Sequence, residues 1–171
     1  REPLPAGAAQ TTSTHYRDED GGWIYDASAL ERGMRAFYDE TGVEPFVYIL
    51  PNGSVTSPTE LGNMANELFD DEAHFLLVFC DDGQGSFNCG YAVGSQAKTV
   101  MDDEAVGILA DYLDRYYADM SLSEEEIFAR AFEDTGERIM SKTTSPVVYV
   151  AICAAVVIVA ALAYTPQLTL K

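Results

Sequence analysis

Residues 46–50, Phe-Val-Tyr-Ile-Leu, are the stretch of sequence that decides the fold. A strand with one face in water alternates apolar and polar residues, but this run does not alternate. A second run at 75–80, Phe-Leu-Leu-Val-Phe-Cys, has the same character. Both runs therefore predict central strands covered on both faces, the first of them spanning Glu44 to Leu50.

Helices are predicted before and between these strands. Ser57–Glu60 combines a capping box with Pro at the first helical position, so a helix is expected to begin there. An earlier helix is predicted to be capped by Asp26 and to end at Thr41-Gly42. The apolar triplet Trp23-Ile24-Tyr25 just before it predicts a short first strand.

The second half of the domain predicts a hairpin followed by two helices. Asp81–Gly85 is typical of a turn, and the alternation at 87–93 predicts a partner strand with a less covered face. Asp102 or Asp103 is expected to cap the next helix, and Ser123–Glu126 is a second capping box. This order of elements predicts an α/β fold, a three-layer α/β/α sandwich with a small mixed sheet.

The end of the chain has a different composition, because residues 143–170 contain no charge. A membrane-spanning helix needs about 20 apolar residues, and residues 145–164 supply them. We therefore predict one C-terminal transmembrane helix at 145–164 and a short tail at 165–171. The alternative is a buried core helix, but a soluble helix of this length without a polar face is uncommon.

The beginning of the chain predicts a flexible arm. Residues 1–20 are rich in Pro and Ala and then in polar side chains, so we expect a linker there and the folded domain at 21–142. The chain begins without an initiator Met, so we expect further sequence upstream. The few charges beside the span do not fix its orientation.

The charge of the chain limits its partners. The formal net charge is −18, and the predicted span contributes almost none of it. An acidic surface repels phosphate backbones, which excludes nucleic acid as a partner. The same surface attracts divalent cations and proteins with a basic surface, so these are the expected partners besides the membrane that holds the C-terminal helix.

Aspartates beside the predicted strands suggest a calcium site. Calcium takes about six to eight oxygen ligands, which separate loops can supply when strand ends bring them together. Asp26 follows the first predicted strand, and Asp81 and Asp82 follow a buried one. If those strands are parallel, the three carboxylates lie at one rim. The alternative is that Asp26 is only a helix cap and that Asp81 and Asp82 only form a turn.

Two of the three cysteines lie outside the predicted membrane helix, and the sequence carries no recognised catalytic motif. Cys80 and Cys89 lie on strands predicted to be antiparallel neighbours, so a disulfide forms if they are opposite one another, and a one-residue shift in register leaves two thiols. The sequence contains no P-loop, no G-x-S-x-G and no H-E-x-x-H, so no nucleophile is identified. A metal-assisted hydrolase would need only clustered carboxylates and an open coordination position.

Several short segments together resemble the TPM-domain family, which includes thylakoid-lumen photosystem repair proteins and bacterial membrane-anchored relatives. The resemblance covers residues 21–140 and rests on Gly22-Trp23-Ile24-Tyr25-Asp26, Thr41-Gly42-Val43-Glu44-Pro45, Asp81-Asp82 and Gly90-Tyr91-Ala92-Val93-Gly94. It implies an α/β/α sandwich outside the cytoplasm beside one or two membrane spans. It also implies binding of divalent metal, chiefly calcium, at acidic loops, and in some members an acid phosphatase activity.

The resemblance extends the candidate metal ligands to five aspartates. Asp26, Asp81 and Asp82 match acidic positions of the family, and Asp102 and Asp103 lie in the acidic segment after its glycine-rich turn. The implied function is a membrane-anchored, extracytoplasmic, calcium-binding module for interaction with, or maintenance of, envelope proteins. The alternative is a metal-dependent acid phosphatase at the cell surface. In the hairpin the chain has Asp82-Gly83-Gln84-Gly85, whereas in relatives a basic residue often follows the aspartate, so a positive charge that could hold phosphate is missing.

Overall fold

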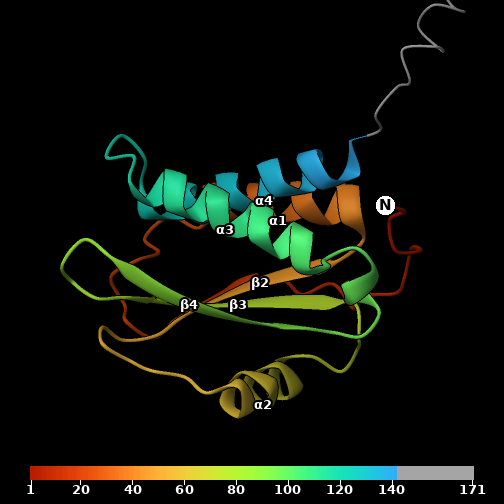
Figure 1. The fold of residues 1–171 in the computed structure, drawn as a ribbon, viewed down its shortest axis with the longest axis horizontal. Coiled ribbons are helices and arrows are strands. Elements are labelled where there is room, and N and C mark those ends of the chain that lie inside the picture. Colours follow the sequence, from red (N-terminus) through yellow and green to blue (C-terminus); the bar gives the residue numbers. More distant parts are fainter. Residues whose placement is uncertain (142–171) are drawn as a thin grey trace, which may run out of the picture. The chain divides into compact units, whose positions relative to one another are not determined.

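The two apolar runs form the centre of a four-stranded mixed sheet (Figure 1). β2 (Glu44–Ile49) is buried at every residue, and β3 (His74–Asp81) at every residue except the last. β1 (Tyr16–Asp18) pairs with β2 and β2 with β3, in both cases parallel, whereas β4 (Phe87–Val93) is antiparallel to β3. The predicted central strands and the mixed sheet are confirmed.

The computed structural model describes residues 1–141. The predicted membrane helix at 145–164 and the tail at 165–171 lie outside these residues. Among the helices that are described, none has both the length and the apolar character needed to cross a membrane.

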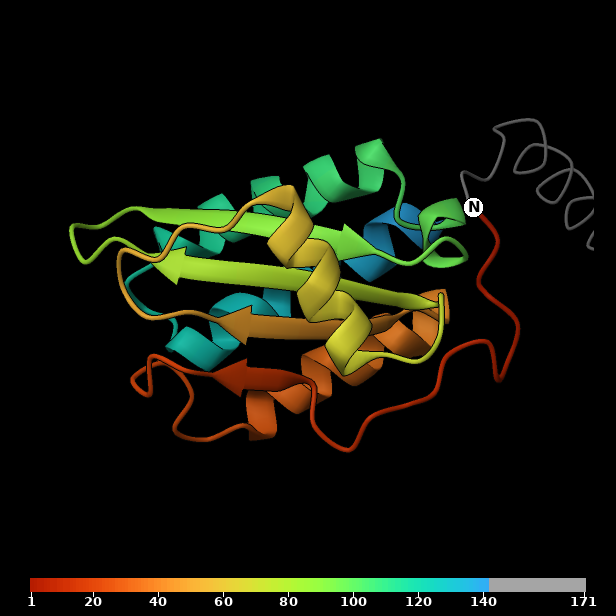
Figure 2. The same ribbon diagram turned by 90° about the horizontal axis from the view of Figure 1, so that it is seen from below.

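Helices cover both faces of the sheet, which gives three layers (Figures 1 and 2). α1 (Ser28–Thr41), α3 (Asp103–Tyr117) and α4 (Glu124–Met140) lie on one face, and α2 (Pro58–Leu68) lies on the other. A single 3-10 turn (Ala97–Thr99) precedes α3. Side chains alternate along the strands, so Val47 and Ile49 enter the larger core under three helices, while Phe46 and Tyr48 enter the smaller core above α2.

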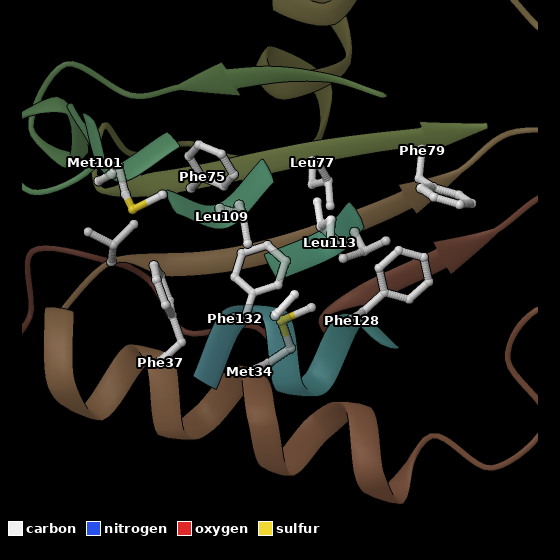
Figure 3. Packing of buried hydrophobic residues seen from close by; sticks show 14 of the residues in the cluster. Met34, Phe37, Phe75, Leu77, Phe79, Met101, Leu109, Leu113, Phe128 and Phe132 are labelled. Carbon is white, nitrogen blue, oxygen red and sulfur yellow. The ribbon is translucent and has the colours of Figure 1, made fainter. Parts of the chain in front are cut away.

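The larger core is built from aromatic and long aliphatic side chains of β3 and its three helices (Figure 3). Phe37 packs edge-on against Phe132, with ring centroids 5.3 Å apart. α1 and α4 approach one another closely at Gly33, where an added Cβ would lie 2.4 Å from the carbonyl oxygen of Ala129. The fully buried large side chains include Met34, Phe75, Phe79, Leu109, Leu113 and Phe128.

The prediction of a first strand at Trp23–Tyr25 is wrong. The first strand is β1 at Tyr16–Asp18, inside the segment 1–20 whose composition predicted a flexible arm. The backbone N–H groups of Trp23 and Tyr25 donate to carboxylates instead of to a neighbouring strand, so this apolar segment is a loop. Trp, Ile and Tyr favour strands, but here their backbone N–H groups bond to side-chain carboxylates, and this outweighs the local preference.

The expected helix caps are confirmed with one exception. Ser57 and Glu60 form a complete capping box, Asp102 accepts from the N–H of Ala105 at the start of α3, and Ser123 and Glu126 bond reciprocally. The exception is Asp26, because α1 has Ala27 at the N-cap position. The Asp26 carboxylate accepts instead from the N–H and the hydroxyl of Ser28.

Cys80 and Cys89 are free thiols, so of the two outcomes that the sequence left open the structure shows the one without a disulfide. The register pairs Phe79 with Cys89 and Cys80 with Asn88, which is the one-residue shift left open above. Directly paired residues project to the same face of a sheet, and adjacent ones to opposite faces. The two thiols therefore point to opposite sides.

Candidate functional site

The parallel strands end at one rim of the sheet, and the loops that follow them meet there. β1 leads into the loop 19–27 and β3 into the hairpin turn at 82–86. The end of α3 also lies at this rim, since the hydroxyl of Tyr117, its last residue, donates to Asp81 at 2.8 Å. In open α/β sheets, ligands bind preferentially beyond the carboxyl ends of the strands, so this rim is the candidate site.

An open groove of about 530 Å³ lies at this rim. Its aromatic side chains are fixed by the core, because Trp23 packs against Phe79 with centroids 4.7 Å apart and Tyr117 packs against Phe87 at 4.8 Å. Met120 lies in the turn at the groove and is 95% exposed. The full lining comprises Trp23, Asp81, Gly85, Tyr117, Ala118, Asp119, Met120, Leu122, Glu124 and Ile127.

Two carboxylates shape the loop that carries Trp23. Asp18 accepts the N–H groups of Trp23 at 2.9 Å and of Ile24 at 3.0 Å. Glu125 accepts those of Tyr25 at 2.7 Å and of Asp26 at 3.0 Å. Desolvation acts to raise the pKa of the buried Glu125, but the backbone donors outweigh it and lower the pKa, so the carboxylate is held in its ionised form.

The groove carries negative charge beside its aromatic rings. Asp119 accepts from the hydroxyl of Ser121 at 2.6 Å and from its N–H at 3.0 Å, and these bonds lower the pKa of Asp119. Desolvation, and then the hydrogen bond to Asp81, raise the pKa of Tyr117 to about 12, so it remains a neutral donor. With Asp81 and Glu124, the groove suits a ligand that combines positive charge with an apolar group.

Three of the five predicted metal ligands lie at this rim. Asp26 is in the loop before α1, and Asp81 and Asp82 are at the hairpin turn. One oxygen of Asp82 accepts from the N–H groups of Gln84 at 2.7 Å and of Ser86 at 3.0 Å, and Asp81 accepts from the N–H of Gly83 as well as from Tyr117. These carboxylates thus serve as turn acceptors.

The other two predicted ligands lie at the opposite end of the strands from the rim, where β2 and β3 begin. β4 is antiparallel to β3 and therefore ends where β3 begins, so the start of α3 is separated from Asp81 by the length of β3. Asp102 caps α3 and pairs with Arg1 at 2.7 Å, and this pairing and then the Ala105 N–H lower its pKa. Asp103 is exposed in the first turn. Within residues 1–141, no three His, Cys, Asp or Glu side chains are grouped to hold a metal ion, and calcium binding stays a prediction.

A buried cluster that was not predicted from the sequence lies at that opposite end of the strands. His15 lies between Glu31, with Nδ1 2.5 Å from Oε2, and Glu44, with Nε2 3.1 Å from Oε1. Thr12 donates to Glu44 through its N–H at 2.7 Å and its hydroxyl at 2.9 Å. A signal existed, because Glu44 opens a strand that is otherwise apolar, and a buried carboxylate requires partners.

Comparison with known proteins adds evidence on the fold. No family model matches the chain, and no curated protein matches it. Among solved structures, the chain is similar to the solution NMR structure of the N-terminal domain of cg2496 from Corynebacterium glutamicum. The identity is 11% and the TM-score 0.58, over 85% of this chain and 93% of that one. At this identity the likeness shows a common fold alone. The resemblance to the TPM-domain family stays a prediction.

Proposed function

We propose that this chain is an interaction module whose acidic rim groove binds a basic segment of a partner protein. In this proposal, residues 145–164 anchor the module to a membrane and the α/β domain lies outside the cytoplasm. The observation that carries it is the composition of the groove, which joins Asp81, Asp119 and Glu124 to fixed aromatic rings.

This composition favours an interaction module over a phosphatase. A phosphate group needs cationic or N–H donors to hold it. The described lining of the groove contains three carboxylates and neither lysine nor arginine. A Lys or Arg side chain, in contrast, would meet opposite charge and an aromatic surface for its alkyl stem and its cation.

Trp23 provides the readout for a binding experiment, because it is the only tryptophan of the chain and lines the groove. We would titrate the 171-residue chain, in detergent solution, with a synthetic peptide that contains arginines and one leucine, and follow Trp23 fluorescence. Saturable binding is expected. The double variant Asp119→Asn with Glu124→Gln should weaken it about tenfold, since each exposed ion pair contributes about 0.2–1 kcal/mol.

The matched control is Glu67→Gln with Asp70→Asn, which removes the same charge from the α2 side of the sheet. This variant should bind nearly as the unmodified chain does. Equal weakening by both variants would mean that only total charge matters, and would refute the groove as the site. A calcium titration of the same signal tests the calcium prediction separately.

A further inference from the structure

β4 is an edge strand that lacks the usual protection of edge strands. It pairs with β3 on one side only, and the sheet ends there. Natural edge strands are commonly blocked by charged side chains or proline. Residues 83–97, which include all of β4, contain neither, although the chain has 28 acidic residues.

The hydrogen-bond pattern identifies which backbone groups point outward. The N–H of Gly94 donates to the carbonyl of His74 at 3.0 Å, and the N–H of Asp82 to that of Ser86 at 2.9 Å. Hydrogen-bonded pairs alternate along an antiparallel ladder, so Asn88, Gly90 and Ala92 also bond to β3. The N–H and C=O groups that point away from β3 therefore belong to Phe87, Cys89, Tyr91 and Val93.

The outward groups are unpaired within residues 1–141, since the turns and loops make no backbone bond to these four residues. Two of the four side chains are exposed, those of Cys89 and of Tyr91, the latter at 43%, whereas Phe87 and Val93 are partly buried against the larger core. The edge thus offers four alternate residues with both donor and acceptor to an incoming chain.

We propose that the β4 edge accepts an extended segment of a partner protein that carries basic side chains, which adds to the sheet as a fifth strand. Negative charge on α3, beside the β4 edge, favours a segment with basic side chains. Asp114 of α3 is near enough to Cys89 to contribute, after desolvation, to raising the pKa of that thiol. α3 carries four acidic residues and one basic residue, so a second copy of the chain would bring like charges together. The proposal concerns a different surface from the rim groove and does not rest on it.

Amide hydrogen exchange of the 171-residue chain, measured by NMR in detergent solution, tests the proposal. The probe is a peptide of alternating lysine and valine. Its addition should slow exchange at Phe87, Cys89, Tyr91 and Val93 by about tenfold, the scale of one added hydrogen bond. The amides of Asn88, Gly90 and Ala92, already bonded to β3, should change little.

Two controls separate strand addition from general attraction to an acidic surface. The same peptide with alternate backbone nitrogens methylated keeps its charge but cannot pair fully, and should give no protection. Cys89→Pro removes an outward N–H that β3 does not use, and should abolish protection, whereas Cys89→Ser should retain it.

Protection that is equal for both peptides, or absent from the four outward amides, would overturn the proposal. Slow exchange of those amides in the chain alone, increasing with its concentration, would overturn it in favour of pairing between two copies. These exchange measurements do not depend on Trp23 fluorescence, so the proposal for the β4 edge can fail without affecting the proposal for the rim groove.

Discussion

Glu31, Glu44 and Glu125 each accept hydrogen bonds from segments that are distant in the sequence. Glu31 and Glu44 hold residues 12–15 beside the sheet, and Glu125 holds the loop that carries Trp23. In a chain with 28 acidic residues, these few carboxylates are structural because they are removed from water and receive backbone donors.

Below about pH 6.5, where His15 with its raised pKa is charged, replacing it by alanine should lower the free energy of unfolding by about 3–5 kcal/mol, because it leaves the fully buried Glu44 without its charged partner. Chemical denaturation of the full chain measures the change. His15→Gln retains an amide that can donate to one carboxylate, so its loss should be smaller. Equal stability of the alanine variant and the unmodified chain would contradict a structural role for the cluster.

The same residue should make stability depend on pH. Desolvation acts to lower the pKa of His15, but the hydrogen bonds that its ring donates to Glu44 and then to Glu31 outweigh desolvation, so the pKa is raised in the folded state. The added stability is therefore fully present below about pH 6.5, the unfolded value, and is lost as pH rises through the folded pKa. His15→Gln should lack this loss between neutral and alkaline pH, and parallel curves for the two proteins would refute the assignment.

At the scale of elements, hydrophobic patterns and cap motifs were sufficient for most of the fold. The unbroken apolar runs predicted β2 and β3, and the capping boxes predicted the starts of α2 and α4. β1 could not be found in this way, because three residues carry no periodicity and its partner is chosen by tertiary contacts. The groove could not be predicted because its lining comes from three separate loops and from the ends of the strand and helices beside them.

Glu125 shows why site residues are harder to predict than elements. The sequence placed it among three glutamates at a helix start, where the helix dipole is sufficient to explain acidic residues. Its position three residues before Phe128 places it instead on the buried face of α4. A carboxylate on the apolar face of a helix was the available signal.

The crossing of α1 and α4 supplies a test of packing between elements. Gly33→Ala should destabilise the domain by about 1–3 kcal/mol, because the new Cβ meets the Ala129 backbone, which cannot rotate away. Thermal or chemical denaturation measures the effect. Gly62→Ala in α2 is the matched control, since nothing lies within 4 Å of its added Cβ. That variant should gain about 0.5–1 kcal/mol, and destabilisation of both helices alike would refute the steric account.

At the scale of the whole molecule, net charge should govern the response to salt. With 28 acidic and 10 basic residues, the folded chain repels itself, and ions screen that repulsion. Raising NaCl from low to moderate concentration should increase stability by about 1 kcal/mol, or roughly 4 °C in Tm. Scanning calorimetry at matched ionic strength with CaCl2 separates screening from specific binding. A Tm that does not change with NaCl would contradict the prediction.

The placement of α1 and α2 on opposite faces has a consequence for handedness. The sheet order advances in one direction from β1 through β2 to β3, so two crossovers with helices on opposite faces have opposite hands. The crossover through α2 is right-handed and the one through α1 is left-handed (Figure 2). Strand twist makes about 98% of such connections right-handed. The connection from β1 through α1 to β2 has the disfavoured hand, so twist does not help to place β1 beside β2. The segment 12–15 that leads into β1 is held instead by hydrogen bonds to Glu31 and Glu44. These bonds exist only after α1 and β2 have assembled, and we expect β1 to join the sheet last during folding.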